Sequence, residues 1–172
     1  GNVSKKGRML DTLLEVFIRL KDPFNLLILG DGKDWDFYQS QTKQIKNIIM
    51  KRAIPQNKLV QYISGADIGL CLFDTSSLSY YYSLPNKIFE YAQAKLIIFV
   101  CPGKELKLFS KTHPSTFVMN KLDTNSLFEY FSLWNYDKVT YNKKLLLNYK
   151  PPLWEKEKGK LISVFLKLLY RC

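Results

Sequence analysis

The side chains best suited to hold a charged ligand lie in one segment, YYYSLPNKIFEY, at residues 80–91. On a helix, Asn86 and Glu90 share one face because they are four residues apart, and Lys87 is also a neighbour of Glu90. A lysine and free N–H groups at a helix start bind phosphate, and a carboxylate one turn later can accept two sugar hydroxyls. A solvated surface helix explains the same pattern, so the segment alone leaves both interpretations open.

Two glycine-containing segments could also contact an anion. Residues 1–8 combine Gly1 with Lys6 and Arg8 ahead of a helical pattern, where amides and basic side chains favour an anion. Gly30 and Gly32 follow a short apolar run, and glycines let a ligand approach the backbone closely. The alternatives are a solvated basic tail for the first segment and an ordinary turn for the second.

Several chemistries are excluded by residue type and spacing. The sequence has neither the GxGxxG dinucleotide fingerprint nor the GxxxxGK[ST] phosphate loop. Cys71, Cys101 and Cys172 form no CxxC pair and His113 is the only histidine, so we expect no metal site. Cys71 and Cys101 lie in apolar runs, which indicates buried thiols in a reducing compartment.

The elements that position these residues alternate between apolar strands and amphipathic helices. Such alternation predicts an α/β fold, Rossmann-like, with a parallel sheet in a three-layer α/β/α arrangement. Ligands of such sheets bind at the carboxyl ends of strands, which points to the loops at residues 1–8, 30–33 and 74–86. Strands are expected at residues 26–29, 68–73, 96–100 and 116–119, and helices at residues 9–20, 34–51, 55–64, 85–94, 105–110, 124–134, 138–147 and 154–170.

Length and charge set the outline of the molecule. The 172 residues predict one domain at residues 1–150, with residues 151–172 as its C-terminal helix. The chain opens without a strand before its first loop, so we expect its first strand to be missing. No apolar run approaches the ~20 residues that span a bilayer, and no signal-peptide pattern occurs, so a cytoplasmic protein is expected.

The net charge of +11 favours an anionic partner. Nucleotide phosphates, nucleic acid and a lipid surface all fit that charge. The last helix adds apolar residues to several lysines, and we expect it to pack against the sheet or a partner domain, with a membrane surface as the alternative. The apolar residues of this helix are Leu161, Ile162, Phe165, Leu168 and Leu169.

The segment PNKIFEY at residues 85–91 resembles the PNK-[LI]-FEY motif of nucleotide-sugar glycosyltransferases. More narrowly, it resembles the C-terminal, donor-binding domain of GT-B enzymes of the group 1, or family four, type, which build capsule, lipopolysaccharide and other bacterial surface glycans. Further segments with family-like patterns follow the same order along the chain, namely residues 1–10, 26–32, 55–70 and 154–155.

This resemblance implies one half of a GT-B fold and a retaining transfer of sugar from a nucleoside diphosphate to a glycan or lipid-linked acceptor. The nucleotide sugar, with UDP-sugar the expected donor, is a substrate, and neither cofactor nor metal is implied. The implied partners are this donor and a missing N-terminal, acceptor-binding domain, with peripheral contact at the inner face of the cytoplasmic membrane and no nucleic acid. This domain alone is expected to bind nucleotide weakly and to transfer no sugar.

The resemblance also implies roles for individual residues, although it identifies no catalytic residue. Arg8, with Lys6 as a second candidate, takes the place of the basic residue that contacts the diphosphate, and Glu90 that of the glutamate that holds the ribose. Residues 51–54 would border the base. The other implied nucleotide-sugar-binding residues are Gly1, Gly30, Gly32, Ser83, Leu84, Pro85, Asn86 and Lys87.

The sequence departs from the family pattern at several positions. Tyr82 stands where many members have the first glutamate of Glu-x7-Glu, and Lys95 and Ile97 replace a usual Gly and Pro. One extra residue separates Gly1 from Arg8. The missing first glutamate favours one alternative, a non-catalytic nucleotide- or phosphate-binding module. The net positive charge and the 15% aromatic content permit another, a basic nucleic-acid-binding domain.

Overall fold

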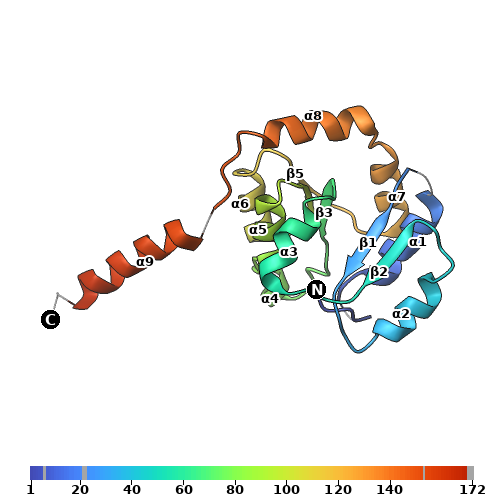
Figure 1. Ribbon diagram of the computed structural model, residues 1–172, viewed down its shortest axis with the longest axis horizontal. Helices are drawn as coiled ribbons and strands as arrows, with labels where there is room; N and C mark the ends of the chain where they lie inside the picture. Colours follow the sequence, from blue (N-terminus) through green and yellow to red (C-terminus); the bar gives the residue numbers. More distant parts are fainter. Residues whose placement is uncertain (6, 21–22, 153, 170–172) are drawn as a thin grey trace.

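The computed structural model (Figure 1) describes residues 1–5, 7–20, 23–152 and 154–169. Lys6, one of the expected diphosphate ligands, lies outside the described residues, and so does Cys172. The described chain forms an α/β body of two parallel sheets with helices around them, followed by one separate C-terminal helix.

The first sheet pairs β1 (Leu26–Leu29) with β2 (Ile48–Lys51) in parallel, with Leu26 opposite Ile48. Helix α1 (Leu10–Leu20) and strand β1 confirm the helix expected at residues 9–20 and the strand expected at residues 26–29. The expected helix over residues 34–51 is wrong in its second half, because α2 (Trp35–Thr42) ends early and β2 follows. The short apolar run at residues 48–50 is compatible with the end of a helix and with a strand. It forms a strand because it pairs with β1.

The second sheet has the order β3-β4-β5, all parallel, and its strands lie within a few residues of the predicted ones. One short helix, α4, occupies the end of the expected polar loop. The strands are β3 (Ile68–Cys71), β4 (Ile97–Val100) and β5 (Thr116–Val118), and the helices around them are α3 (Gln56–Ile63), α4 (Leu78–Tyr81), α5 (Asn86–Gln93) and α6 (Lys104–Ser110).

Strand β4 shows the layered arrangement most directly, because all four of its residues are fully buried. Ile97 and Phe99 join the cluster that contains α1 and α7 (Thr124–Ser132). Ile98 and Val100 point the other way, into the cluster that contains α5 and α6. A strand that is apolar on both faces is typical of a parallel sheet covered by helices on both sides, which confirms the three-layer α/β/α fold.

Helix α8 (Tyr136–Leu146) crosses the amino ends of the second sheet. Lys143 Nζ donates to Asp67 Oδ1 at 2.8 Å just before β3, and Ser115 Oγ donates to the Asn142 carbonyl at 3.0 Å just before β5. Lys95, just before β4, donates to the carbonyl of Leu147 at 2.7 Å. This edge of the sheet is therefore covered by a helix, and the carboxyl edge is the one left for a ligand.

The N-terminal segment lies between the two sheets (Figure 1). Asn2 forms a parallel bridge with Asp31, and Val3 N–H donates to the Asp31 carbonyl at 2.9 Å. Among the described residues, β1 and β3 belong to separate sheets and share no ladder. The segment therefore occupies the position of the carboxyl end of a strand beside β1.

Helix α9 (Trp154–Leu169) stands apart from the α/β body (Figure 1). Its described apolar side chains are exposed, including Leu161, Phe165 and Leu168. The expectation that this helix packs against the sheet is therefore wrong, and a partner domain or a membrane surface stays a prediction. In the part of the chain that the structure describes, no helix is both long and apolar enough to cross a membrane.

Candidate functional site

A hollow of about 440 Å³ opens at the carboxyl ends of the strands, the edge where parallel sheets bind ligands. Residues from the three loops singled out in the sequence line it together. Its walls include hydroxyl, carboxylate and basic groups. The lining residues are Asn2, Ser4, Gly7, Arg8, Lys33, Asp74, Ser76, Ser77 and Tyr80.

A left-handed turn at Gly7 brings Arg8 to the wall of this hollow. Gly7 has φ +71°, a conformation that glycine adopts without a steric penalty. Just before the turn, Lys5 N–H donates to Asp34 Oδ2 at 2.8 Å, and the Lys5 ammonium lies 3.4 Å from the centre of the Phe37 ring. The segment is thus tied to the body by Lys5, while Arg8 is left to face the hollow.

The turn at Gly30 and Gly32 lies directly beneath the N-terminal segment. A Cβ on Gly30 would collide with the Gly1 backbone, and one on Gly32 would collide with the Val3 carbonyl. These glycines therefore make room for the chain's own first residues, on which the hollow is built. The following residue, Lys33, lines the hollow with its exposed side chain.

Asp31, between these two glycines, holds the loop that follows β2. Its carboxylate accepts from Ala53 N–H at 3.0 Å and from the Arg52 guanidinium at 3.1 Å. The Ala53 amide and then Arg52 hold the pKa of the Asp31 carboxyl below its usual value. Asp31 thereby holds the loop at residues 51–54 against the turn formed by Gly30 and Gly32.

The loop after β3 supplies the opposite wall. Asp74 accepts from Ser76 N–H at 2.9 Å and from the Ser76 hydroxyl at 3.0 Å, which closes a tight polar turn. Ser77 then caps α4 by accepting from Tyr80 N–H at 3.3 Å. Tyr80 packs on Phe73, the buried residue that follows β3, with ring centres 5.7 Å apart.

Helix α5 places Lys87 and Glu90 near the same edge of the sheet. Burial raises the pKa of the Cys71 thiol to about 12, and the charges of Lys87 and Arg8 act against this shift. Lys87 and Arg8 therefore lie close enough to the carboxyl end of β3 to act on the same atom. Both Lys87 and Glu90 also lie near the Gly1 nitrogen.

The expected site residues are thus partly brought together. Arg8 lines the hollow, and Lys87 and Glu90 lie near Gly1. Gly1, Gly30 and Gly32 do not line it but lie where the N-terminal segment packs against the turn after β1. The other expected residues, at positions 83–86, do not line the hollow. The Ser83 hydroxyl donates to the Tyr80 carbonyl at 2.9 Å, and Pro85 immediately precedes α5. Leu84 and Asn86 are exposed. Eight lining residues were not among the predicted site residues, although all of them lie within the three loops named from the sequence: Asn2, Ser4, Gly7, Lys33, Asp74, Ser76, Ser77 and Tyr80.

The charges around the hollow are mostly positive. Arg8, Lys33 and Lys87 form no ion pair with any residue in the described ranges, and Asp74 is the one carboxylate that lines the hollow. The described residues also contain no group of three or more His, Cys, Asp or Glu side chains arranged to hold a metal ion. Unpaired cations beside hydroxyls form a surface that favours an anion.

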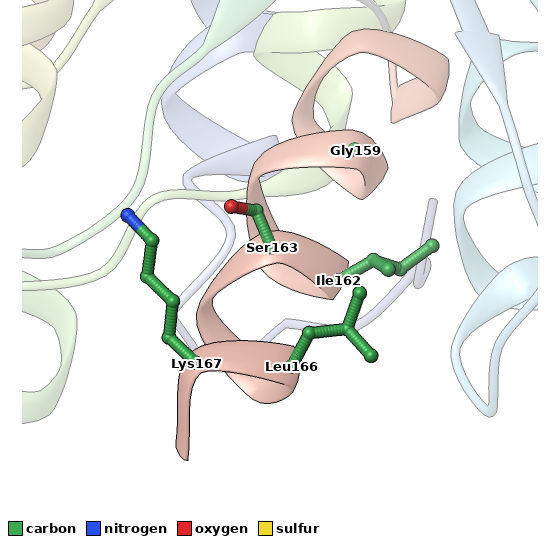
Figure 2. Close-up of a pocket in the computed structure, with 5 residues that line it drawn as sticks. All are labelled: Gly159, Ile162, Ser163, Leu166 and Lys167. Carbon is green, nitrogen blue, oxygen red and sulfur yellow. The ribbon is translucent and has the colours of Figure 1, made fainter. Parts of the chain in front are cut away.

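A second hollow lies on α9 (Figure 2), and all the residues that line it come from that helix. Ile162 and Leu166 point to one side of the helix, and Ser163 and Lys167 to the other, with Gly159 one turn earlier. This is an open depression on an exposed helix, formed where Gly159 lacks a side chain. A single helix face of this kind does not enclose a ligand.

No protein-family model matches the sequence, and no curated protein sequence matches it either. Solved structures do match its fold. The catalytic domain of cholesterol-alpha-glucosyltransferase from Helicobacter pylori has a TM-score of 0.61 at 14% identity, and the match covers 87% of this chain and 95% of that one.

WaaG, a glycosyltransferase involved in lipopolysaccharide biosynthesis, has a TM-score of 0.58 at 14% identity. That match covers 87% of this chain and 42% of WaaG, so the chain spans less than half of that protein. The resemblance found in the sequence is thus confirmed for the fold: this chain has the three-layer α/β/α architecture of GT-B glycosyltransferase structures.

Proposed function

We propose that this chain is the donor-binding domain of a glycosyltransferase and that its hollow holds the diphosphate of a nucleotide sugar. The observation that carries the proposal is the meeting of Arg8 and Lys33 with the hydroxyls of Ser4, Ser76 and Ser77 at the carboxyl edge of the strands. The likeness in fold to two glycosyltransferase structures supports it.

The chemistry of sugar transfer explains why such a hollow is useful. As the sugar leaves the donor, negative charge develops on the diphosphate, and fixed cations and hydrogen-bond donors stabilise that charge. Arg8 can make two parallel hydrogen bonds to phosphate oxygens, whereas Lys33 and Lys87 act as point charges. The hydroxyls of Ser4 and Ser77 add neutral donors.

The remaining parts of the reaction belong to the same proposal. The donor is a UDP-sugar, transfer proceeds with retention at the anomeric carbon, and the acceptor is a glycan or lipid-linked sugar of a bacterial surface polysaccharide. The motif resemblance at residues 85–91 supports these choices. A second, N-terminal domain supplies the acceptor site, so the described domain binds the donor without transferring its sugar.

One observation favours a second candidate, a nucleotide-binding module without transferase chemistry. Tyr82 is half exposed and packs edge-on against Tyr81, with the Lys104 ammonium 5.0 Å from the centre of its ring. A phenol in an aromatic contact cannot replace a carboxylate in the role that the resemblance implies for that position. Donor turnover by the full-length gene product separates the two candidates, because the module would bind UDP without consuming a UDP-sugar.

Calorimetric titration with UDP, GDP, ADP, CMP and inorganic pyrophosphate tests the diphosphate site. We expect at least one nucleoside diphosphate to bind, and Arg8→Ala to weaken pyrophosphate and nucleotide binding by about tenfold, since a charge-assisted contact is worth roughly 1.5–3 kcal/mol. Lys107→Ala is the matched control, because Lys107 is an exposed cation on α6 outside the hollow. Equal effects of the two substitutions, or no binding by the unaltered chain, would overturn the proposal.

A further inference from the structure

Gln56 lies against Glu90 although 34 residues separate them in the sequence. The Gln56 side-chain amide donates from Nε2 to Glu90 Oε1 at 2.7 Å. Gln56 is the first residue of α3, and Glu90 lies in the middle of α5. The contact therefore joins two helices that cover the same face of the sheets.

The packing of α3 against α5 fixes the separation of this pair. Ile63 of α3 is buried in a small apolar cluster with Ala94, and Leu59 and Val60 pack against it together with Tyr91. Tyr91, next to Glu90, is in turn held on β3, where its hydroxyl donates to the Leu70 carbonyl at 3.3 Å. Apolar contacts therefore hold the two helices together, and the Gln56–Glu90 hydrogen bond lies at the exposed edge of that contact.

The hydrogen bond leaves two acceptors available on neighbouring side chains. One is the second carboxylate oxygen of Glu90 and the other is the amide oxygen of Gln56, and neither accepts a hydrogen bond from the described part of the chain. Two adjacent acceptors match two adjacent hydroxyl donors, the arrangement that the 2′- and 3′-hydroxyls of a ribose present. The Gln56 amide also restricts the rotation of the carboxylate, so the free oxygen keeps one direction.

The surroundings of Gln56 place it between the two parts of a nucleoside. On one side the loop at residues 51–54 leads directly into α3, and Asp31 holds that loop through Ala53 N–H and Arg52. On the other side Glu90 lies near Gly1, whose backbone is in close contact with the Gly30 turn. A ligand that reaches from the 51–54 loop to the hollow thus passes the Gln56–Glu90 pair.

We infer that Gln56 is a positioning residue for Glu90 and, with it, a determinant of specificity for a ribonucleoside over a 2′-deoxyribonucleoside. The inference rests on the proposed function, since it assigns a subsite of the same nucleotide site. Gln56 contacts the ligand through its amide oxygen and orients the carboxylate through its amide nitrogen. A methionine at this position has nearly the same length and removes both groups.

The test compares affinities for UDP, 2′-deoxy-UDP and inorganic pyrophosphate, measured by calorimetry on the unaltered chain, on Gln56→Met and on Gln61→Met. Gln61 is an exposed glutamine of the same helix with no contact to Glu90, so it is the matched control. We expect the unaltered chain and Gln61→Met to prefer UDP over 2′-deoxy-UDP by about tenfold. In Gln56→Met this preference falls to less than about twofold, and pyrophosphate binding is unchanged.

A second variant, Gln56→Glu, tests the same inference without a change in side-chain shape. It removes the donor and places a second negative charge beside Glu90, so the preference for ribose falls at least as far as in Gln56→Met. An unchanged preference in both variants would overturn the role of Gln56 and leave the diphosphate site intact. If the unaltered chain binds neither UDP nor pyrophosphate, the proposed function itself fails.

Discussion

At the scale of single residues, the fold changes the titration of His113, the one histidine of the chain. Its side chain is buried, lies between the rings of Phe109 and Tyr149, and has its Nδ1 2.9 Å from the Thr116 hydroxyl. Its Nε2 has no hydrogen-bond partner among the described residues. Burial lowers the pKa of this imidazole to about 4, so the folded chain keeps it neutral.

The pH dependence of stability follows from this shift. Unfolded, His113 binds a proton below about pH 6.5, whereas in the folded chain it does so only near pH 4, so the free energy of unfolding falls as the pH drops between these values. His113→Asn keeps an acceptor near the Nδ1 position and removes the titration. We expect urea unfolding at pH 6.5 and pH 4.5 to show a smaller loss of stability in this variant than in the unaltered chain. Equal losses would contradict the buried neutral imidazole.

At the scale of elements, the contact between α5 and β3 is the one that positions Glu90. Gly69 of β3 faces the ring of Tyr91, and a Cβ added at Gly69 would lie 2.5 Å from the ring carbon Cγ. Tyr91 is a residue through which α5 contacts β3, since its hydroxyl donates to the Leu70 carbonyl. Any atom added at Gly69 must therefore displace the helix as well as the ring.

We expect Gly69→Ala to lower the free energy of unfolding by roughly 1–3 kcal/mol, since the extra methyl overpacks the interface. Nucleotide affinity falls with it, because Glu90 moves away from Gln56. Gly65→Ala is the control: its nearest atom would be the Tyr62 carbonyl oxygen at 4.0 Å, an ordinary contact. Urea unfolding and UDP titration of both variants measure the two effects. A Gly69→Ala chain as stable as Gly65→Ala would show that α5 does not depend on this contact.

At the scale of the whole molecule, the two sheets leave one edge of β1 without a strand along most of its length. The Leu26 N–H donates to the Asn47 carbonyl, and the N–H of Gly30, just after β1, donates to the Lys51 carbonyl. The backbone N–H and C=O groups of the even-numbered residues therefore point toward β2. In a parallel pair the backbone groups of the alternate residues point away from the partner strand. On this second side of β1, the carbonyl oxygen of Leu29 accepts from the Gly1 nitrogen at 2.6 Å. The N–H groups of Leu27 and Leu29 point to this second side.

We expect the amide hydrogens of Leu27 and Leu29 to exchange with solvent faster than that of Ile28, because only the Ile28 amide faces β2. Hydrogen exchange measured by NMR checks this order. Equal exchange rates for the three amides would contradict this expectation.

Helix α9 should contribute little to the stability of the α/β body. Its exposed apolar side chains stand apart from both sheets, so a chain ending at residue 152 is expected to unfold within about 1 °C of the unaltered chain. Thermal unfolding followed by circular dichroism measures this, and a loss of several degrees would mean that α9 packs on the body in solution. Co-sedimentation of both chains with anionic lipid vesicles tests the membrane alternative, since only the chain with α9 should then bind.

The sequence by itself determined the elements whose patterns are local. Continuous apolar runs identified β1, β3 and β4, because strands of a covered parallel sheet are apolar on both faces. Asp123 precedes α7 and is a residue type typical of a helix N-cap, and in the structure its side chain accepts from Ser126 N–H at 3.0 Å. Glycines and breaks between the runs located the loops around the hollow, and the PNKIFEY segment pointed to the fold.

Only the tertiary structure decided what depends on contacts between distant residues. Strand β2 exists as a strand because it pairs with β1, and its own few residues do not distinguish it from a helix end. Lys33 and Ser77 line the hollow because the second and third loops meet there, and Gln56 reaches Glu90 because α3 packs on α5. Local patterns encode backbone conformation, whereas the composition of a site depends on how the packed core brings loops and helices together.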